Sequence, residues 1–284
     1  MAKYRLHHSL GRRHVIRHLY FWAKKHFSDQ KICPHQKVTD AMLVALLLSR
    51  LVFKHPFPSI WWNILKEDRP GLPSYTQAYT RGIKLLPLLE HVASPAQPCT
   101  EVVVDSMPLP ICRPKRTHLC QFPGAKWGFG TQGEFFGYKL HAWVTPGGQI
   151  VQYVIRPANL HDVTVSYELN LRWPEFEGPT IIGDKGYCCL GYVYPPKKNT
   201  RYDTGWRESR HPKIRKRIEI VFSALVEAQI RSAQTKTLGS LKLRVVLAVL
   251  AHNLARPKRR IPLSQSAYFD QYQILLSSFR KESK

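Results

Sequence analysis

The stretch TIIGDKGY, residues 180–187, joins a short apolar run to a carboxylate, Asp184. An unbroken apolar run of this length is typical of a strand buried on both faces of a sheet. A second run of the same kind, Val102-Val103-Val104, ends at Asp105. The sequence therefore predicts two strands that each end in an acid, as in a mixed α/β sheet with helices around it.

A third carboxylate, Glu219, lies in a stretch with helical periodicity. It stands at the border of an apolar face made by Ile214, Ile218, Val221, Phe222, Leu225 and Ile230. Asp184 lies 79 residues after Asp105, and Glu219 follows 35 residues later. Two acids at strand ends and one on a following helix can share a pair of divalent metal ions, as in enzymes that cut and join phosphodiesters. We assign the bridging position to Asp105, because a central first strand is the most rigid support.

Other acids compete for these roles. Asp162 follows an expected strand and is the strongest rival; it could instead stand behind the metal ligands, with His161 beside it. The weaker candidates are Glu134, Asp203 and Glu208, in expected loops, and Glu227, on the helix of Glu219. The alternative for all three principal acids is a structural role as buried or capping carboxylates.

The composition points to an anionic partner. The 284 residues carry 43 Lys and Arg against 19 Asp and Glu, a net charge of +24. Nucleic acid is the first candidate, a membrane surface the second, and a generic basic surface the alternative. The most apolar stretch, residues 42–53, is far shorter than the roughly 20 residues that span a bilayer, and we interpret it as a buried helix.

Six cysteines occur without a CxxC pair: Cys33, Cys99, Cys112, Cys120, Cys188 and Cys189. Cys112, His118 and Cys120 would supply only three zinc ligands, and no second pair completes the site. We therefore expect free thiols in a reducing cytoplasm.

The segment between Asp184 and Glu219 is strongly basic. From residue 197 to residue 217 it carries nine cations: Lys197, Lys198, Arg201, Arg207, Arg210, Lys213, Arg215, Lys216 and Arg217. Such a segment beside metal-binding acids suits a phosphate backbone, although a solvated basic loop is the alternative. Lys185, directly after Asp184, could hold the scissile phosphate. Trp206 could stack on an unpaired or flipped base, or simply pack.

Residues 1–98 are expected to form a helical DNA-binding or dimerisation domain, which could include a helix-turn-helix. The expected helices are 14–27, one from 41 capped by Thr39-Asp40, 60–65 capped by Ser59, and one after Ser74 that runs to about 92. Residues 94–98, SPAQP, favour a linker.

Residues 99–255 are expected to form the α/β catalytic domain, and residues 256–284 a basic tail. The expected strands are 101–105, 136–144, 149–156 and 180–184, with helices at 164–171, 214–230 and 241–254. Trp127 falls between Gly124 and Gly130, in an expected flexible loop.

Five motifs, in this order, resemble the DDE transposases of bacterial insertion sequences. They are Val104-Asp105-Ser106, GYKLH at 137–141, NLHD at 159–162, GDKGY at 183–187, and RIExxFxxL at 217–225. The resemblance covers roughly residues 100–254, and the subgroup is similar to the insertion-sequence family numbered nine-eight-two.

The resemblance implies an RNase H-like catalytic fold whose metal ligands are Asp105, Asp184 and Glu219. It also implies two Mg²⁺ ions per site, for which Mn²⁺ substitutes. The implied reaction is cleavage of double-stranded DNA at terminal inverted repeats, followed by attack of the freed 3′-hydroxyl on target DNA. A homodimer in the bacterial cytoplasm, associated with the nucleoid, is the implied acting form.

One departure from the family concerns phosphate binding. Many relatives surround the glutamate with Tyr-x-x-Arg-x-x-x-Glu-x-x-x-x-x-x-Lys, and here those places hold Pro212, Arg215, Glu219 and Val226. The missing tyrosine and lysine contacts would come from elsewhere, such as Lys216 or Arg217. Two other functions stay open at this point: a structure-specific nuclease or resolvase, and an inactive DNA-binding protein. The sequence leaves open the DNA ends, the transposition pathway and which N-terminal helix reads DNA.

Overall fold

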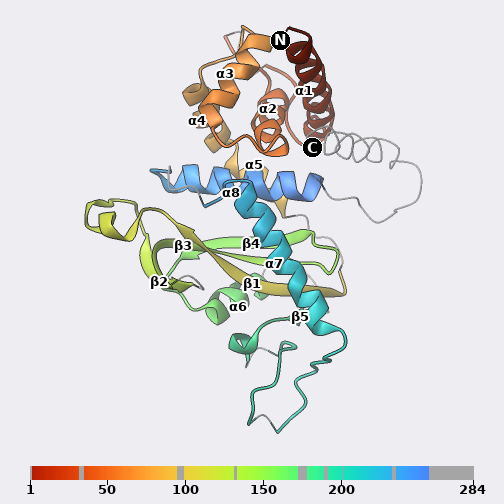
Figure 1. Cartoon of the computed structure of the whole chain (residues 1–284), viewed down its shortest axis with the longest axis vertical. Helices are drawn as coiled ribbons and strands as arrows, with labels where there is room; N and C mark the ends of the chain where they lie inside the picture. Colours follow the sequence, from red (N-terminus) through yellow and green to blue (C-terminus); the bar gives the residue numbers. More distant parts are fainter. Residues whose placement is uncertain are drawn as a thin grey trace, which may run out of the picture. The chain divides into compact units, whose positions relative to one another are not determined.

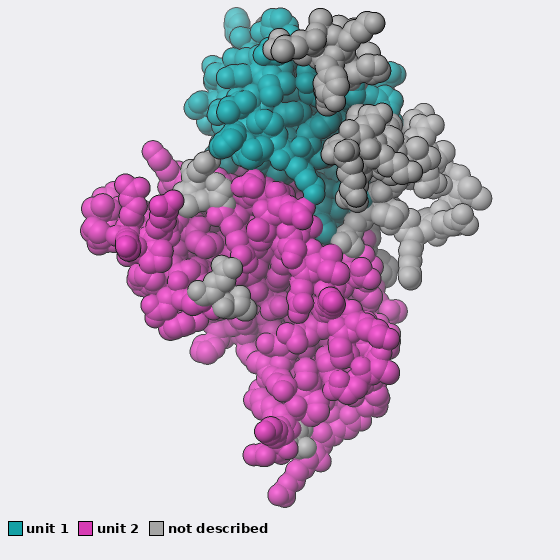
Figure 2. Space-filling model, in the orientation of Figure 1, with its two compact units in different colours: residues 1–89, 250–284 teal, residues 90–249 magenta. Residues whose placement is uncertain are grey.

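The computed structural model describes residues 2–31, 35–94, 99–130, 133–171, 178–188, 191–199, 201–231 and 235–255. The chain divides into two compact units, residues 1–89 with 250–284 and residues 90–249, which are coloured separately in Figure 2. The expected basic tail at 256–284 and all but the first residue of the expected linker at 94–98 lie outside the described residues.

The N-terminal region is helical, as the sequence predicts. Its helices are α1 (Ala2–Ala23), α2 (Asp40–Val52), α3 (Pro58–Asp68), α4 (Tyr75–Lys84) and α5 (Leu86–Ala93). Thr39 caps α2 by accepting a hydrogen bond from the backbone N–H of Met42. The apolar stretch expected as a buried helix is α2. Among the described residues, no helix is long and apolar enough to cross a membrane.

Two helix boundaries differ from the expectation because of proline. Helix α3 begins at Pro58, with Phe57 rather than Ser59 at the cap position, because proline suits the first turn, where an N–H has no partner. The single helix expected to run to about 92 is divided at Leu85 into α4 and α5. Pro87 lacks the N–H that would bond to the carbonyl of Ile83, so the hydrogen-bond ladder breaks there.

The second unit holds a mixed five-stranded sheet (Figure 1). Its strands are β1 (Glu101–Pro110), β2 (Lys126–Gly130), β3 (Gly133–Val144), β4 (Ile150–Pro157) and β5 (Thr180–Ile182). The order is β2-β3-β1-β5, and β4 also pairs with β3. Strand β3 is antiparallel to its neighbours, while β1 and β5 are parallel. The predicted mixed α/β fold is confirmed, and it is consistent with an RNase H-like core.

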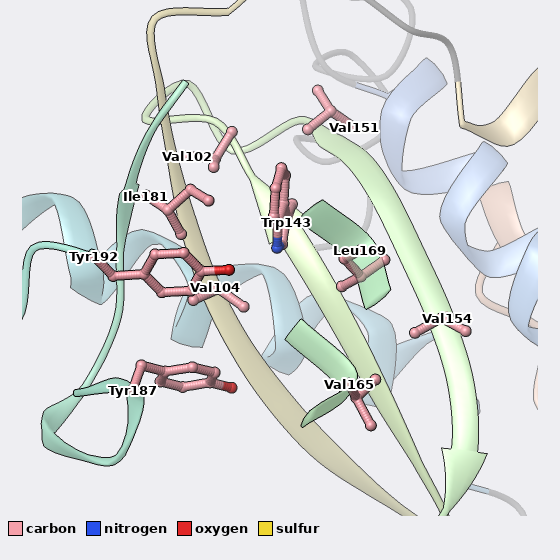
Figure 3. Packing of buried hydrophobic residues seen from close by; sticks show 10 residues of the cluster. All are labelled: Val102, Val104, Trp143, Val151, Val154, Val165, Leu169, Ile181, Tyr187 and Tyr192. Carbon is pink, nitrogen blue, oxygen red and sulfur yellow. The ribbon is translucent and has the colours of Figure 1, made fainter. Parts of the chain in front are cut away.

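Helices cover the sheet. Helix α6 (Asp162–Leu171) packs on one face, where Val104 and Trp143 of the sheet meet Val165 and Leu169 (Figure 3). Helix α7 (His211–Glu227) packs against β1 and buries residues of the predicted apolar face: Ile218, Val221, Phe222 and Leu225. Helix α8 (Leu238–Leu254) and the short 3-10 helices η1 (Pro114–Leu119) and η2 (Lys185–Tyr187) complete the order.

Strand β2 replaces the flexible loop expected around Trp127. It pairs with the first half of β3, with Trp127 opposite Phe136. Glu134, expected in a loop, accordingly lies in β3. Gly128 makes the strand possible, because a Cβ atom there would lie 2.4 Å from the carbonyl oxygen of Ala158. Glycine usually weakens a strand, and here the close approach of another backbone segment requires it.

Replacing Gly128 with Ala is expected to destabilise the protein by about 1–3 kcal/mol, because the added methyl group meets backbone that cannot move aside cheaply. Thermal unfolding followed by circular dichroism measures the loss. Gly147→Ala is the matched control in the same unit, since the nearest atom to its Cβ would be 3.6 Å away. Equal unfolding midpoints for the two variants would contradict the close packing of β2.

Candidate active site

Asp105 and Asp184 are brought together by the register of two parallel strands. Val103 of β1 pairs with Ile182 of β5. Each acid stands two residues after its member of this pair, at the same level of the sheet. Asp184 follows β5, whereas Asp105 lies within β1, which does not end at the acid as expected but continues to Pro110 because it pairs with β3 over that length. Because successive side chains alternate between faces, Asp105 points away from the face that Val104 shares with α6. The electrostatic partner of Asp105 on that other side is Arg215 of α7.

Asp105 is a partly desolvated carboxylate. Burial, together with the negative charges of Asp184 and Asp162, raises its pKa to about 6. The backbone N–H of Ser106, which donates to Oδ1 at 2.7 Å, and the charge of Arg215 act in the opposite direction. A carboxylate held beside other acids in this way favours a bound cation, which would offset both the burial and the repulsion.

The two glycines of GDKGY explain how Asp184 is held. Asp184 caps η2, and its Oδ1 accepts a 2.7 Å hydrogen bond from the N–H of Gly186. A Cβ on Gly186 would lie 2.9 Å from that same oxygen, and a Cβ on Gly183 would lie 2.9 Å from the buried Tyr187 side chain. Both positions therefore leave room only for hydrogen. Lys185, between them, is exposed.

Glu219 lies on the exposed side of α7, one turn after Arg215. It lines a pocket of about 460 Å³ together with Pro195, Trp206, Glu208, Pro212, Arg215 and Lys216. The structure thus brings the third predicted acid beside the predicted base-stacking residue and two predicted phosphate ligands.

Two of the three predicted metal ligands lie near each other in the described part of the chain. Asp105 and Asp184 supply carboxylate oxygens, the donors that Mg²⁺ prefers, from the adjacent strand β1 and the residues just after β5. Within the described residues, however, no three His, Cys, Asp or Glu side chains form a group that could hold a metal ion. Glu219 therefore stays a predicted ligand.

Asp162 is committed to other partners. At the start of α6, its Oδ2 accepts from the Ser106 hydroxyl at 2.9 Å, and its Oδ1 accepts from Lys139 Nζ at 2.8 Å. Ser106 directly follows Asp105, so Asp162 ties α6 and β3 to the strand position beside that acid. Lys139 was not predicted to take part, although a lysine on a largely apolar strand face is a signal that a buried anion faces it.

The two histidines near this cluster differ in exposure. His141 is fully buried, and its Nδ1 lies 4.0 Å from Asp162 Oδ1. Neither ring nitrogen has a hydrogen-bond partner among the described residues, and burial lowers the pKa of His141 to about 4. His161 is exposed, and its side chain makes no hydrogen bond or ion pair in the described part of the structure.

The basic segment presents mostly exposed cations. Lys197, Lys198, Arg201, Lys213, Lys216 and Arg217 are exposed. Two others are held by acids: Arg207 by Asp203 at 3.4 Å, and Arg210 by Glu101 at 2.6 Å. The second pair ties the start of α7 to the start of β1.

Trp206 is half-buried within this segment. Its Nε1 donates to Glu208 Oε1 at 2.8 Å, and its ring lies 5.3 Å from that of His211. One edge of the indole is therefore held in place while the side chain also lines the pocket of Glu219.

Four cysteines, Cys99, Cys112, Cys120 and Cys188, are reduced thiols outside any disulfide bond. Cys112 and Cys120 are hydrogen-bonded to each other, and burial and this contact raise the pKa of Cys112 to about 11. Cys33 and Cys189 lie outside the described residues.

The comparison with known families agrees with the geometry. A family model described as "Transposase DDE domain" matches residues 99–254, which include β1 to β5, Asp105, Asp184 and the helix of Glu219. No curated protein and no solved structure matches the chain. The match covers more than half of the 284 residues, so the chain belongs to the family of transposases with a DDE domain.

Proposed function

We propose that this transposase cleaves double-stranded DNA at the terminal inverted repeats of its element and joins the freed 3′-hydroxyl to target DNA. The observation that carries the proposal is the shared level of Asp105, within β1, and Asp184, just after the parallel strand β5. That arrangement concentrates negative charge at one edge of a basic protein, which is unfavourable unless cations bind there.

In the proposed mechanism, Asp105, Asp184 and Glu219 would together hold two Mg²⁺ ions, for which Mn²⁺ would substitute. The ions would activate the attacking oxygen and stabilise charge on the leaving oxygen. The chain's own contribution is orientation. The N–H groups of Ser106 and Gly186 each fix one carboxylate oxygen of the aspartates. Asp162, through Ser106 and Lys139, holds β1 in place behind Asp105.

The DNA path proposed for the substrate follows the exposed cations of residues 197–217, with Lys185 next to the scissile phosphate. Arg215 would serve two purposes, since it faces Asp105 and also lines the pocket of Glu219. We propose that Trp206 stacks on a base near the cut, because it lines the same pocket and aromatic rings hold unpaired bases well.

The proposed reaction favours assembly as a homodimer, because the two ends of the element must be held together while they are cut and joined. The helices of residues 1–98 are the proposed DNA-binding and dimerisation region. The setting would be the bacterial cytoplasm, on nucleoid DNA.

The test is a cleavage and strand-transfer assay on the element's own ends with Mg²⁺. Asp184→Asn and Glu219→Gln are each expected to reduce both products by roughly 10³-fold, since a metal ligand contributes several kcal/mol to the transition state. Glu227→Gln is the matched control, because Glu227 is an exposed acid two turns further along α7, and it should retain activity.

Three outcomes separate the proposed function from its competitors. Cut ends without joined product would favour a structure-specific nuclease. DNA binding without metal-dependent cleavage would favour an inactive binding protein. Full activity of Asp184→Asn would overturn the assignment of the site.

A further inference from the structure

Two large aromatic side chains project into solvent from β2. Trp127 is 45% exposed and Phe129 is 73% exposed, and they stand two residues apart, on one side of the strand. Leu119, at the end of η1, is 69% exposed. Apolar groups of this size are usually buried, and a cluster of them on a surface marks a binding site more often than isolated ones do.

The aromatic pair is held rigidly. Gly128, between the two aromatics, lies flush against Ala158, so the opposite side of β2 is closed by packing. Trp127 also stands edge-on to Phe136 of β3, with ring centroids 5.7 Å apart and an interplanar angle of 66°. A binding surface whose side chains are already ordered loses little conformational entropy when it takes up a ligand.

The sequence around the aromatic pair is mostly cationic. Residues 111–133 contain no Asp or Glu, and the nearest acid along the chain is the exposed Glu134, which pairs with Phe129 across the hairpin. They contain four exposed cations: Arg113, Lys115, Arg116 and Lys126. A cationic segment repels a copy of itself, whereas it attracts a phosphate backbone. Aromatic rings among cations are the combination that binds single-stranded nucleic acid, because every base has a face that can stack.

We propose that Trp127 and Phe129 form a stacking surface for unpaired bases of DNA, and that the four cations of residues 113–126 hold the adjoining phosphates. This inference rests on the proposed DNA substrate and adds a contact to it. In the sheet order, β2 lies at the opposite end from β5, which precedes Asp184 and the basic segment. The surface would therefore bind a part of the DNA other than the phosphates held by residues 197–217.

The experiment compares two probes by fluorescence anisotropy: a blunt duplex, and the same duplex with a single-stranded oligothymidine tail. Wild-type protein should bind the tailed probe more tightly, with quenching of tryptophan fluorescence that Trp127→Phe removes in part. Trp127→Ala and Phe129→Ala should each weaken binding of the tailed probe by roughly 5- to 100-fold, the range for loss of one stacked base. Binding of the blunt duplex should not change.

Controls distinguish this surface from general effects. Tyr167→Ala removes another exposed aromatic, on α6 of the same unit and 54% exposed, and should leave both affinities unchanged. Circular dichroism verifies that each variant is folded, and Phe129→Leu provides a milder change that keeps apolar area but removes the ring. It should behave like Phe129→Ala if stacking is the cause.

Three results would overturn the inference. If Trp127→Ala and Phe129→Ala bind the tailed probe as tightly as wild type, the two side chains do not stack on bases. Normal binding of the blunt duplex in that case would leave the proposed function intact. A change of molar mass in light scattering, with both DNA affinities unchanged, would make the surface a protein interface instead. Wild-type protein that binds neither probe would overturn the proposed function as well.

Discussion

Replacing Asp105 with Asn is expected to abolish DNA cleavage and, at neutral pH, to make the metal-free protein more stable. An amide cannot bridge two cations as a carboxylate does, so activity should fall by roughly 10³-fold or more. The gain in stability has a separate cause. Asp105 is buried beside the charges of Asp184 and Asp162, and the substitution removes a charge that this environment disfavours.

The pH dependence of that gain follows from the raised pKa. In the folded protein the pKa of Asp105 is about 6, against an ordinary value of 3.8, so the folded state holds this proton more tightly than the unfolded state. The stabilising contribution of the protonated group is complete below pH 3.8 and is lost as the pH rises to about 6. At pH 7 the cost of the ionised group reaches about 3 kcal/mol as an upper bound.

Thermal unfolding midpoints in the presence of a chelator measure this effect. Wild type and Asp105→Asn should differ most near pH 7 and converge near pH 4. Glu219→Gln is the matched comparison: it should share the loss of activity but not the gain in stability, because Glu219 is exposed. An Asn variant that is equally or less stable than wild type at pH 7 would show that Asp105 is not a desolvated ligand.

Replacing Asp162 with Ala is expected to destabilise the protein by about 2 kcal/mol and to lower activity by roughly 10-fold. The change leaves Lys139, whose side chain is only 13% exposed, without its carboxylate at 2.8 Å, and it removes the acceptor of the Ser106 hydroxyl. A nearly buried charge without a partner is costly. Activity should fall because such groups orient the metal ligands, and their removal typically lowers metal affinity or activity by about 10- to 100-fold.

Chemical denaturation and the cleavage assay measure the two effects. Glu168→Ala is the control, since Glu168 lies on the same helix and pairs with Arg156, but both side chains are about one third exposed; we expect a loss of less than about 1 kcal/mol. The pair Lys139→Met and Asp162→Leu should, when combined, lose less stability than the sum of the single changes. Equal losses for Asp162→Ala and Glu168→Ala would indicate that Asp162 does not support the site.

Much of the fold could be predicted because its signals are local. The apolar runs before Asp105 and Asp184, the alternation of residues 136–144 and the periodicity around Glu219 each reflect one element's own geometry. The division between α4 and α5 was missed, although Pro87 marks it in the sequence. Strand β2 could not be predicted from the sequence, because Gly124, Gly128 and Gly130 suggest a loop. Only the close approach of the Ala158 backbone explains why this strand contains a glycine at position 128.

The same distinction between local and long-range signals applies to the candidate active site. The sequence by itself indicated which acids follow apolar strand-forming runs, which acid lies on a helix, and how cationic the segment between them is. It did not show that β1 continues past Asp105 to Pro110. Only the tertiary structure decided that Asp105 and Asp184 stand at one level, that burial raises the pKa of Asp105, and that Asp162 is engaged by Ser106 and Lys139. The physical reason is range: periodicity and capping act within a few residues, whereas strand register, burial and electrostatic coupling depend on residues that are far apart along the chain.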